Sequence, residues 1–312
     1  MRWRIIPLLA FLTLGLAAAQ GPFSRVPVAS SQTLHIGDAN IQVDFAPGTF
    51  NLGQAAILNH VRMAANAVTT YYGRFPVPRD RVLILPIAAR SGVFHGTTWG
   101  GLHGWPAFTR ISIGTATTQA DLANDWMMTH ELVHTAFPSL PDKNHWMEEG
   151  LATYVEPIAR VQAGELPAAG IWHDMLRDMP KGEPQPGDQG LDRTPTWGRT
   201  YWGGAMFCLV ADVTIRRQTH NRKGLQDALR AIVNAGGTID QNWDLPRALK
   251  IGDRATGTHV LTRMYSKWKD KPVNVDLAKL GRDLGVAVDG GTVRFNDAAP
   301  LAGVRKAITA RP

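Results

Sequence analysis

Cysteine is almost absent from this sequence of 312 residues, and its scarcity excludes two kinds of architecture. The one cysteine, Cys208, rules out an intramolecular disulfide framework and any metal cluster built from several thiolates. It lies in the apolar stretch "GAMFCLVA", where the simplest role is that of a small buried side chain. The fold must therefore be stabilised by packing.

Long apolar runs are also lacking after the first twenty residues. Arg2 and Arg4 precede the apolar stretch "IIPLLAFLTLGLA", and "AAAQ" offers a small-residue cleavage site after Ala19. Residues 1–19 are therefore predicted to be a secretory signal peptide, and the protein to be secreted or periplasmic. An uncleaved anchor is the alternative, but the run is short for a hydrocarbon core of about 30 Å. We expect no stable membrane insertion after cleavage.

Clustered positive charge is the third feature that the sequence lacks. The formal net charge is +7, but the basic residues are scattered and form no run of five or more. Proteins that bind nucleic acids usually carry a basic stripe or a recognisable motif. The sequence therefore predicts no nucleic-acid partner.

The hydrophobic pattern changes from mixed to mostly helical along the chain. Strands, helices and loops are predicted from alternation, helical spacing and glycine content: paired strands in 32–46 around Gly37 and Asp38, a helix in 52–75, strands in 81–88 and 108–114, a glycine-rich loop in 91–105, a helix in 121–137 and a Pro/Gly-rich loop in 179–199. We predict an α+β fold in which a small mixed sheet packs on the 121–137 helix. Residues 20–160 would form this part, and residues 161–312 a mostly helical part that completes the site.

The motif "HELVH", His130 to His134, indicates a metal site. Residues four apart lie on one face of a helix, so both imidazoles can bind one ion. Imidazole suits zinc, and Glu131 lies beside the ligands as a candidate general base. The motif is fairly specific, and it stands inside a segment with strong helical periodicity.

A catalytic zinc site needs a third protein ligand and an open position for water. The metzincin pattern would require Gly at 137 and His at 140, but the sequence has Phe137 and Leu140. A second helix is predicted from Trp146 onward, with Asn144 as its N-cap. It opens with Glu148 and Glu149, which are about 100° apart on a helix, so only one of them can face the ion. The residues alone leave both open.

A family resemblance distinguishes the two carboxylates. "HELVH…HWMEEGLATY" resembles the gluzincin metallopeptidases, in particular the aminopeptidase N and glycyl aminopeptidase families. In those families the Glu before Gly on the second helix is the third zinc ligand, which implies one zinc held by His130, His134 and Glu149. The resemblance also implies a thermolysin-like catalytic half. The fourteen residues between His134 and Glu149 form a shorter connection than those families have.

A second block, residues 201–232, resembles the glycyl aminopeptidase pattern. It begins "YWGGAM", and the equivalent Tyr in the aminopeptidase N families stabilises the oxyanion. This resemblance assigns Tyr201 that role, although Gly203 stands where those families have Lys. A hydroxyl directed at developing negative charge is the chemistry that such a role requires.

The substrate strand of aminopeptidase N enzymes carries a Glu that binds the free amine, and this sequence has no acidic residue from Val93 to Gly114. We therefore expect acetylated peptides to be cut about as well as free ones. His103 is expected at the surface, and His95, His145 and His173 have no spacing that indicates a role.

Together these observations predict a secreted zinc metallopeptidase that acts on a peptide or protein substrate, with Glu131 as general base and Tyr201 as oxyanion donor. An inactive peptide-binding protein that retains the gluzincin fold is one alternative, and an aminopeptidase is another. A structural zinc domain is disfavoured, because structural zinc sites are usually rich in cysteine.

Overall fold

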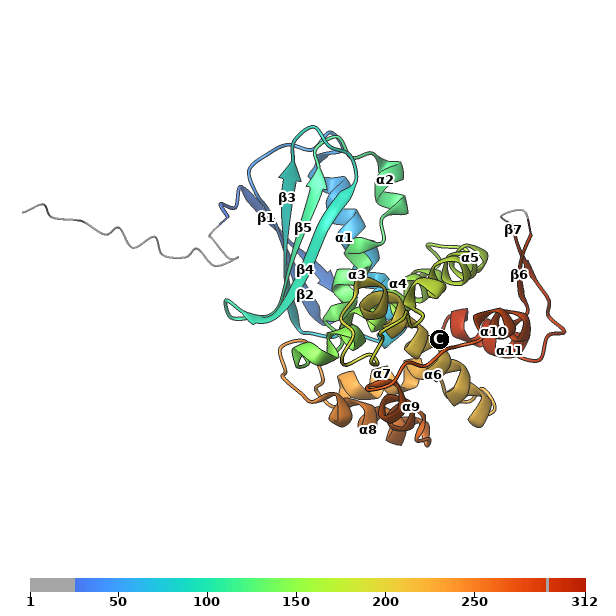
Figure 1. Cartoon of the computed structure of the whole chain (residues 1–312). Coiled ribbons are helices and arrows are strands. Elements are labelled where there is room, and N and C mark those ends of the chain that lie inside the picture. Colours follow the sequence, from blue (N-terminus) through green and yellow to red (C-terminus); the bar gives the residue numbers. More distant parts are fainter. Residues whose placement is uncertain (1–25, 290–291) are drawn as a thin grey trace, which may run out of the picture.

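A mixed β-sheet and a set of helices make up this protein, whose structure is a computed structural model that describes residues 26–289 and 292–312. The five-stranded sheet lies in the N-terminal part, and helices occupy most of the rest (Figure 1). α1 (Gly53–Tyr72) and α3 (Met127–His134) pack against the sheet, and α4 (His145–Ala163) packs against both helices. The predicted α+β fold class is confirmed.

The sheet has the strand order β1-β2-β3-β5-β4. Its strands are β1 (Ser30–Ile36), β2 (Ala39–Phe45), β3 (Arg79–Ile87), β5 (Trp105–Gly114) and β4 (Val93–Leu102). The outer strands β1 and β4 are antiparallel to their neighbours, whereas β2, β3 and β5 run parallel, so the sheet is mixed as predicted. The predicted hairpin turn at Gly37 and Asp38 is confirmed, because Ile36 pairs with Ala39.

The prediction of a loop over residues 91–105 was wrong, because β4 occupies most of this segment. A two-residue turn joins β4 to β5, and both of its residues, His103 and Gly104, have positive φ, as tight hairpins require. Gly96 and Gly100 lie within the strand, at points where other parts of the chain approach its backbone closely. The glycines that indicated a loop are therefore strand residues at close contacts.

The single helix predicted over residues 121–137 is two helices, α2 (Gln119–Asn124) and α3. Asp125 has an extended backbone and ends the first helix. Its carboxylate accepts the N–H groups of Met127 and Met128, at 2.9 and 3.1 Å, and so caps the start of α3. The same carboxylate lies 2.8 Å from Nε2 of His60 on α1, which ties the start of α3 to the neighbouring helix.

The remainder of the described chain is mostly helical, as predicted. After α4 come α5 (Ala168–Asp178), η2 (Met179–Gly182), the π-helical turn η3 (Arg199–Gly203), α6 (Gly204–Gln218), α7 (Leu225–Asn234), α8 (Leu245–Thr256), α9 (Val260–Trp268), α10 (Leu277–Leu284), the hairpin of β6 (Val286–Asp289) and β7 (Thr292–Phe295), and α11 (Ala302–Thr309). A short 3-10 turn, η1 (Asp142–Asn144), precedes α4. The predicted division at residue 160 falls inside α4 and stays a prediction.

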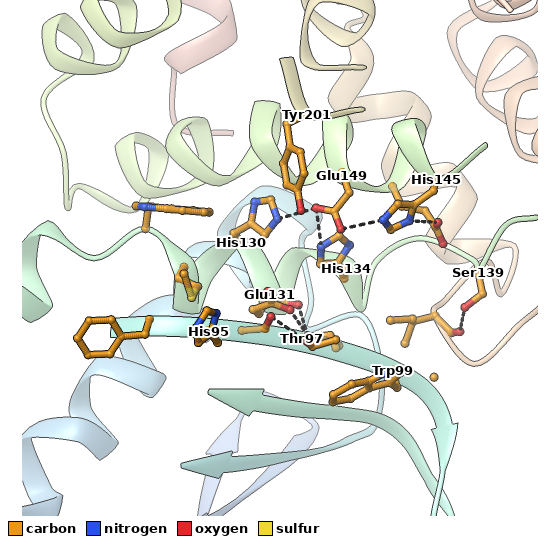
Figure 2. Close-up of a pocket in the computed structure, with 18 residues that line it drawn as sticks. His95, Thr97, Trp99, His130, Glu131, His134, Ser139, His145, Glu149 and Tyr201 are labelled. Atoms are coloured by element: carbon orange, nitrogen blue, oxygen red, sulfur yellow. Dashed lines mark hydrogen bonds and ion pairs between the residues drawn. The ribbon is translucent and has the colours of Figure 1, made fainter. Parts of the chain in front are cut away.

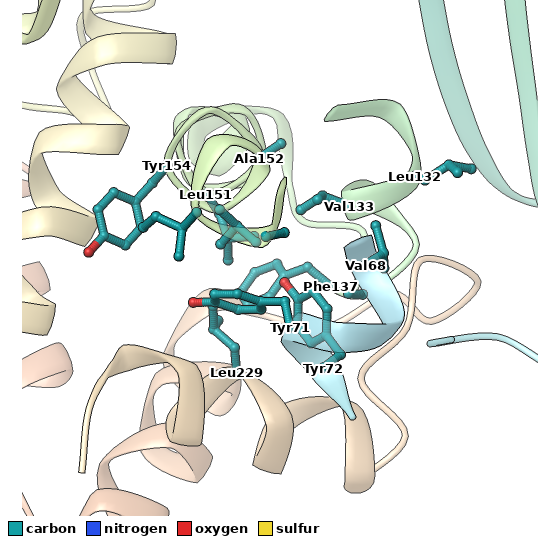
Figure 3. Close-up of a cluster of buried hydrophobic side chains, with 14 of the residues drawn as sticks. Val68, Tyr71, Tyr72, Leu132, Val133, Phe137, Leu151, Ala152, Tyr154 and Leu229 are labelled. Atoms are coloured by element: carbon teal, nitrogen blue, oxygen red, sulfur yellow. The ribbon is translucent and has the colours of Figure 1, made fainter. Parts of the chain in front are cut away.

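One hydrophobic core joins the sheet part to the helical part (Figure 3). Val68 of α1, Val133 of α3, Leu151 of α4 and Leu229 of α7 are at most 1% exposed. Burying side chains of this size stabilises the fold by about 1.5–3 kcal/mol each. This packing fixes α3 relative to α4, and these two helices carry the predicted metal ligands.

The predicted signal peptide, residues 1–19, lies outside the described residues. Among the described residues, no helix has both the length and the apolar character that a membrane crossing requires.

Candidate metal centre

The two predicted imidazole ligands lie on one face of α3, one turn apart. The ring centres of His130 and His134 are 5.0 Å apart, and His130 is buried. Because the Asp125 carboxylate caps the first turn of α3, the helix begins just before these residues and holds their rings in place. Figure 2 shows both rings directed toward α4.

The third predicted ligand, Glu149, projects from α4 toward the same point. One carboxylate oxygen, Oε2, lies 3.1 Å from Nε2 of His130 and 3.6 Å from Nε2 of His134. One potential ligand atom from each of the three residues falls within a mutual distance of 4.8 Å. Two imidazoles and a carboxylate are a donor set that suits zinc, so the residues present fit the metal that the motif implies.

Tyr201 lies next to this cluster because α4 and α6 cross very closely. A Cβ on Gly150 would lie 2.3 Å from the Cα of Gly204, so neither position leaves room for a side chain. Glu149 directly precedes one glycine, and η3, which carries Tyr201, directly precedes α6. The crossing therefore brings the Tyr201 hydroxyl to the Glu149 carboxylate, and the ring of Tyr201 stacks on His130 at 6.3 Å (Figure 2).

The charges of the cluster shift the pKa values of its members. Burial alone would raise the pKa of Glu149, but hydrogen bonds from His130 and His134 hold it well below its usual range. Burial likewise opposes protonation of His134, but its bond to Glu149 and the nearby carboxylates raise its pKa to about 9. Burial, followed by the charges of Glu149 and Glu131, raises the pKa of Tyr201 to about 12. The phenol therefore keeps its proton at neutral pH and is a hydrogen-bond donor.

Glu131 projects from α3 toward β4. Its side chain occupies the space above Gly96, where a Cβ would lie 2.4 Å from the Glu131 Cγ. The hydroxyl of Thr98 donates to the Glu131 carboxylate at 2.8 Å and holds it in place. Gly96 and Thr98 of the edge strand thus position the candidate base. The sequence did not reveal this role, because its glycine content predicts a loop here.

His145 was also missed by sequence reasoning. Its Nε2 lies 3.4 Å from the second oxygen of Glu149, and its Nδ1 lies 3.1 Å from Glu148. Glu148 accepts, in addition, the backbone N–H of Leu140 at 3.1 Å. Glu148 therefore secures the short connection between α3 and α4, while His145 supports Glu149. In the sequence, this role is indicated only by the spacing of Glu148 and Glu149, which follow His145 by three and four residues. Side chains at this spacing are neighbours on the surface of a helix.

A cavity of about 570 Å³ surrounds these groups. Its walls are residues 94–100 of β4, the polar face of α3, the first turn of α4, Tyr201, Ser139 and Ile239. His95 and Trp99 belong to this wall, whereas His173 does not. We call this the first cavity. Within the described chain, β4 has β5 as its one strand neighbour, so its other edge borders this space.

A second cavity, of about 600 Å³, lies on the other side of Tyr201. It shares Trp126, His130 and Tyr201 with the first cavity, and its remaining walls come from the end of α2, α4, Leu166, α5 and the segment 181–202. The long Pro/Gly-rich segment that the sequence predicted as a loop therefore contributes directly to the surroundings of the cluster.

No family model matches the amino-acid sequence, and no curated protein matches it. Solved structures do match. An aminopeptidase N family protein from Idiomarina loihiensis superposes with a TM-score of 0.59 at 12% identity, over 87% of this chain and 53% of that one. A variant of an M1 zinc metallopeptidase from Deinococcus radiodurans gives 0.52 at 15% identity, over 81% and 57%. A form of it bound to a Tyr-Ser-Ala substrate gives 0.50 at 13% identity, over 80% and 53%.

The chain thus has the fold of these aminopeptidase N family and M1 zinc metallopeptidase structures, as the resemblance of its motifs implies. It spans about half the length of the solved structures that it matches.

Proposed function

We propose that this protein is a zinc metallopeptidase that hydrolyses peptide bonds in the first cavity. The observation that carries the proposal is the convergence of His130, His134 and Glu149 within 4.8 Å, beside Glu131 and Tyr201. The neighbours in fold are M1 zinc metallopeptidases, and one of them is described with a bound tripeptide substrate, which supports a peptide substrate here.

His130, His134 and Glu149 would hold the ion. When bound, zinc supplies a Lewis acid that polarises a carbonyl and makes water a better nucleophile at neutral pH. Glu131 acts as the general base that takes a proton from the attacking water, and it then gives this proton to the leaving amine. Its bond to Thr98 keeps the carboxylate oriented for both transfers.

Tyr201 donates its hydroxyl proton in a hydrogen bond to the oxygen on which negative charge develops. Its raised pKa supports this role, because a phenol that stays protonated near pH 7 remains a donor throughout the reaction. Stacking on His130 limits the movement of its ring, so little reorganisation is needed.

An extended peptide would bind along β4 by strand addition, since this strand forms the edge of the sheet. Residues 94–100 line the first cavity, and Glu131 lies directly beside Gly96. A peptide at this edge would run along β4 and pass beside the Glu131 side chain. We further propose a location outside the cytoplasm, on the basis of the sequence of residues 1–19.

Two measurements test the proposal. Elemental analysis should find about one zinc per chain; Glu149→Ala should lose it, whereas Glu148→Ala should retain it. Loss of zinc from the Glu148 variant alone would contradict the ligand assignment. Mass spectrometry of a peptide mixture should then reveal cleavage by the zinc-loaded protein. A zinc-loaded protein that binds peptides without cutting them would instead be the non-catalytic alternative.

A further inference from the structure

The second cavity has no part in the function proposed so far, yet it adjoins the candidate metal site. Trp126, His130 and Tyr201 line both cavities. One face of the wall that they form borders the candidate metal site, and the other borders about 600 Å³ of space. Because His130 and Tyr201 belong to the candidate site, the second cavity begins directly beside the place where the bond would be cut.

The first cavity is bounded by packed backbone at its Ser139 end, which is the end away from Trp126. Trp126, His130 and Ser139 follow one another along α3 and the segment after it. At the Ser139 end, β4 packs directly on the segment after α7, because a Cβ on Gly100 would lie 2.0 Å from the Ile239 carbonyl oxygen. A peptide that extends beyond the metal ligands is therefore directed toward Trp126, where the second cavity begins.

Two exposed tryptophans flank this junction. Trp126 is 49% exposed, and its ring meets that of His130 edge to face at 5.3 Å. Trp197 is 61% exposed and stacks on Tyr201 at 5.9 Å. Large apolar side chains exposed together beside a cavity are typical of a binding surface. Trp126 thus contacts a member of the cluster, and Trp197 contacts the tyrosine beside it.

Charges in the second cavity are already paired across its own walls. Each of the three acidic lining residues contacts a basic lining residue: Glu156 with Arg160 at 3.0 Å, Asp174 with Arg177 at 2.8 Å and Asp178 with Lys181 at 2.7 Å. None of the three acids is left without a cationic partner, so these walls offer no ready counter-charge to a charged substrate side chain. The walls therefore favour a neutral, apolar occupant.

We propose that the second cavity is a substrate subsite that receives an aromatic or large apolar side chain of the peptide, next to the bond that is cut. Trp197 and Trp126 are its specificity-determining residues, and they contact the side chain through the exposed parts of their indole rings. This inference rests on the proposed function, which supplies the peptide substrate. It adds the substrate specificity, a preference for peptides with a large apolar side chain next to the cleaved bond.

The test compares two peptides that differ only in Phe or Ala at the position next to the observed cut. The protein should prefer the Phe peptide in kcat/KM by about tenfold, as expected for aromatic contacts combined with burial. Trp197→Ala should bring this ratio close to one. Trp105→Ala, which removes an indole that lines neither cavity, should leave the ratio unchanged. A ratio that stays near tenfold in Trp197→Ala would overturn the inference.

A binding experiment separates this inference from the proposed function. Calorimetry with the Glu131→Gln variant should find the Phe peptide bound about tenfold more tightly than the Ala peptide. The added Trp197→Ala substitution should abolish this difference. Binding that depends on Trp197 without any cleavage by the unmodified protein would overturn the catalytic proposal alone. No preference for Phe in either assay would overturn the subsite.

Discussion

The two cavities meet at Trp126, His130 and Tyr201, but they differ in the state of their charged groups. In the first cavity, imidazoles and carboxylates from α3 and α4 converge on one point. This proximity raises the pKa of His134 and lowers that of Glu149. In the second cavity, the acids are paired with basic residues of the same wall, and tryptophans face the open space. Under the two proposals, chemistry belongs to the first cavity and recognition to the second, and they meet at the three shared residues.

This comparison makes a general prediction: changes in the first cavity should alter the rate of hydrolysis or the metal content, whereas changes in the second should alter the choice of substrate.

The largest effect is expected at Glu131. Glu131→Gln should lower turnover by several orders of magnitude while zinc remains bound, because it removes the base and keeps the shape of the side chain. The amide can still accept the bond from Thr98. Steady-state kinetics together with zinc analysis would check this. Substantial turnover by a zinc-loaded Glu131→Gln protein would remove Glu131 from the mechanism.

Tyr201 belongs to the shared wall, and Tyr201→Phe tests whether its hydroxyl serves the chemistry. Turnover should fall by about 10² to 10³ with little change in KM, because the donor acts on the transition state. Tyr72→Phe is a matched control, since the buried Tyr72 hydroxyl has no hydrogen-bond partner among the residues that the structure describes. Equal turnover of the two variants would assign Tyr201 a packing role.

A smaller effect is expected at His145, which contacts the candidate ligand Glu149 without being one of the three clustered donors. His145→Ala should weaken zinc binding by about 10- to 100-fold, since residues that orient a metal ligand contribute on this scale. Competition with a chelator measures the affinity. His173→Ala removes an imidazole that also pairs with a carboxylate but lines neither cavity, and it should leave the affinity unchanged.

The sequence predicted those parts of the site that local spacing determines. His130 and His134 follow from helical geometry alone, and the sheet hairpin at Gly37 follows from its turn. Glu149 and Tyr201 needed a family resemblance, because the crossing that joins them depends on Gly150 and Gly204, which are far apart in the chain.

The features that sequence reasoning missed depend on contacts between distant segments. The glycine content around Gly96 predicts a loop, but Gly96 lies in a strand, and its lack of a side chain makes room for Glu131. The break at Asp125 could not be predicted from periodicity, because it depends on capping and on contact with His60. The second cavity combines Trp126 with Trp197, and only the tertiary fold brings these residues to one space.

The smallest effect is expected when the amino terminus of a substrate is blocked. The first cavity is lined by three carboxylates, and each already has a partner. Glu131 accepts from Thr98, Glu149 faces the imidazoles, and Glu148 accepts from Leu140 and contacts His145. Because each carboxylate is already engaged by a protein group and none lies on β4, the cavity has no carboxylate dedicated to an ammonium on the proposed peptide-binding strand.

N-terminal acetylation should therefore change kcat/KM by no more than about threefold, since a site that does not bind the ammonium gains nothing from its charge. The measurement compares free and acetylated forms of one good substrate. A loss of a hundredfold or more on acetylation would assign the protein to the aminopeptidases. Glu148→Gln would then identify the anchor: if it abolishes the preference for the free amine, Glu148 exchanges its bonds with Leu140 and His145 for the substrate ammonium, and the first cavity performs both chemistry and recognition.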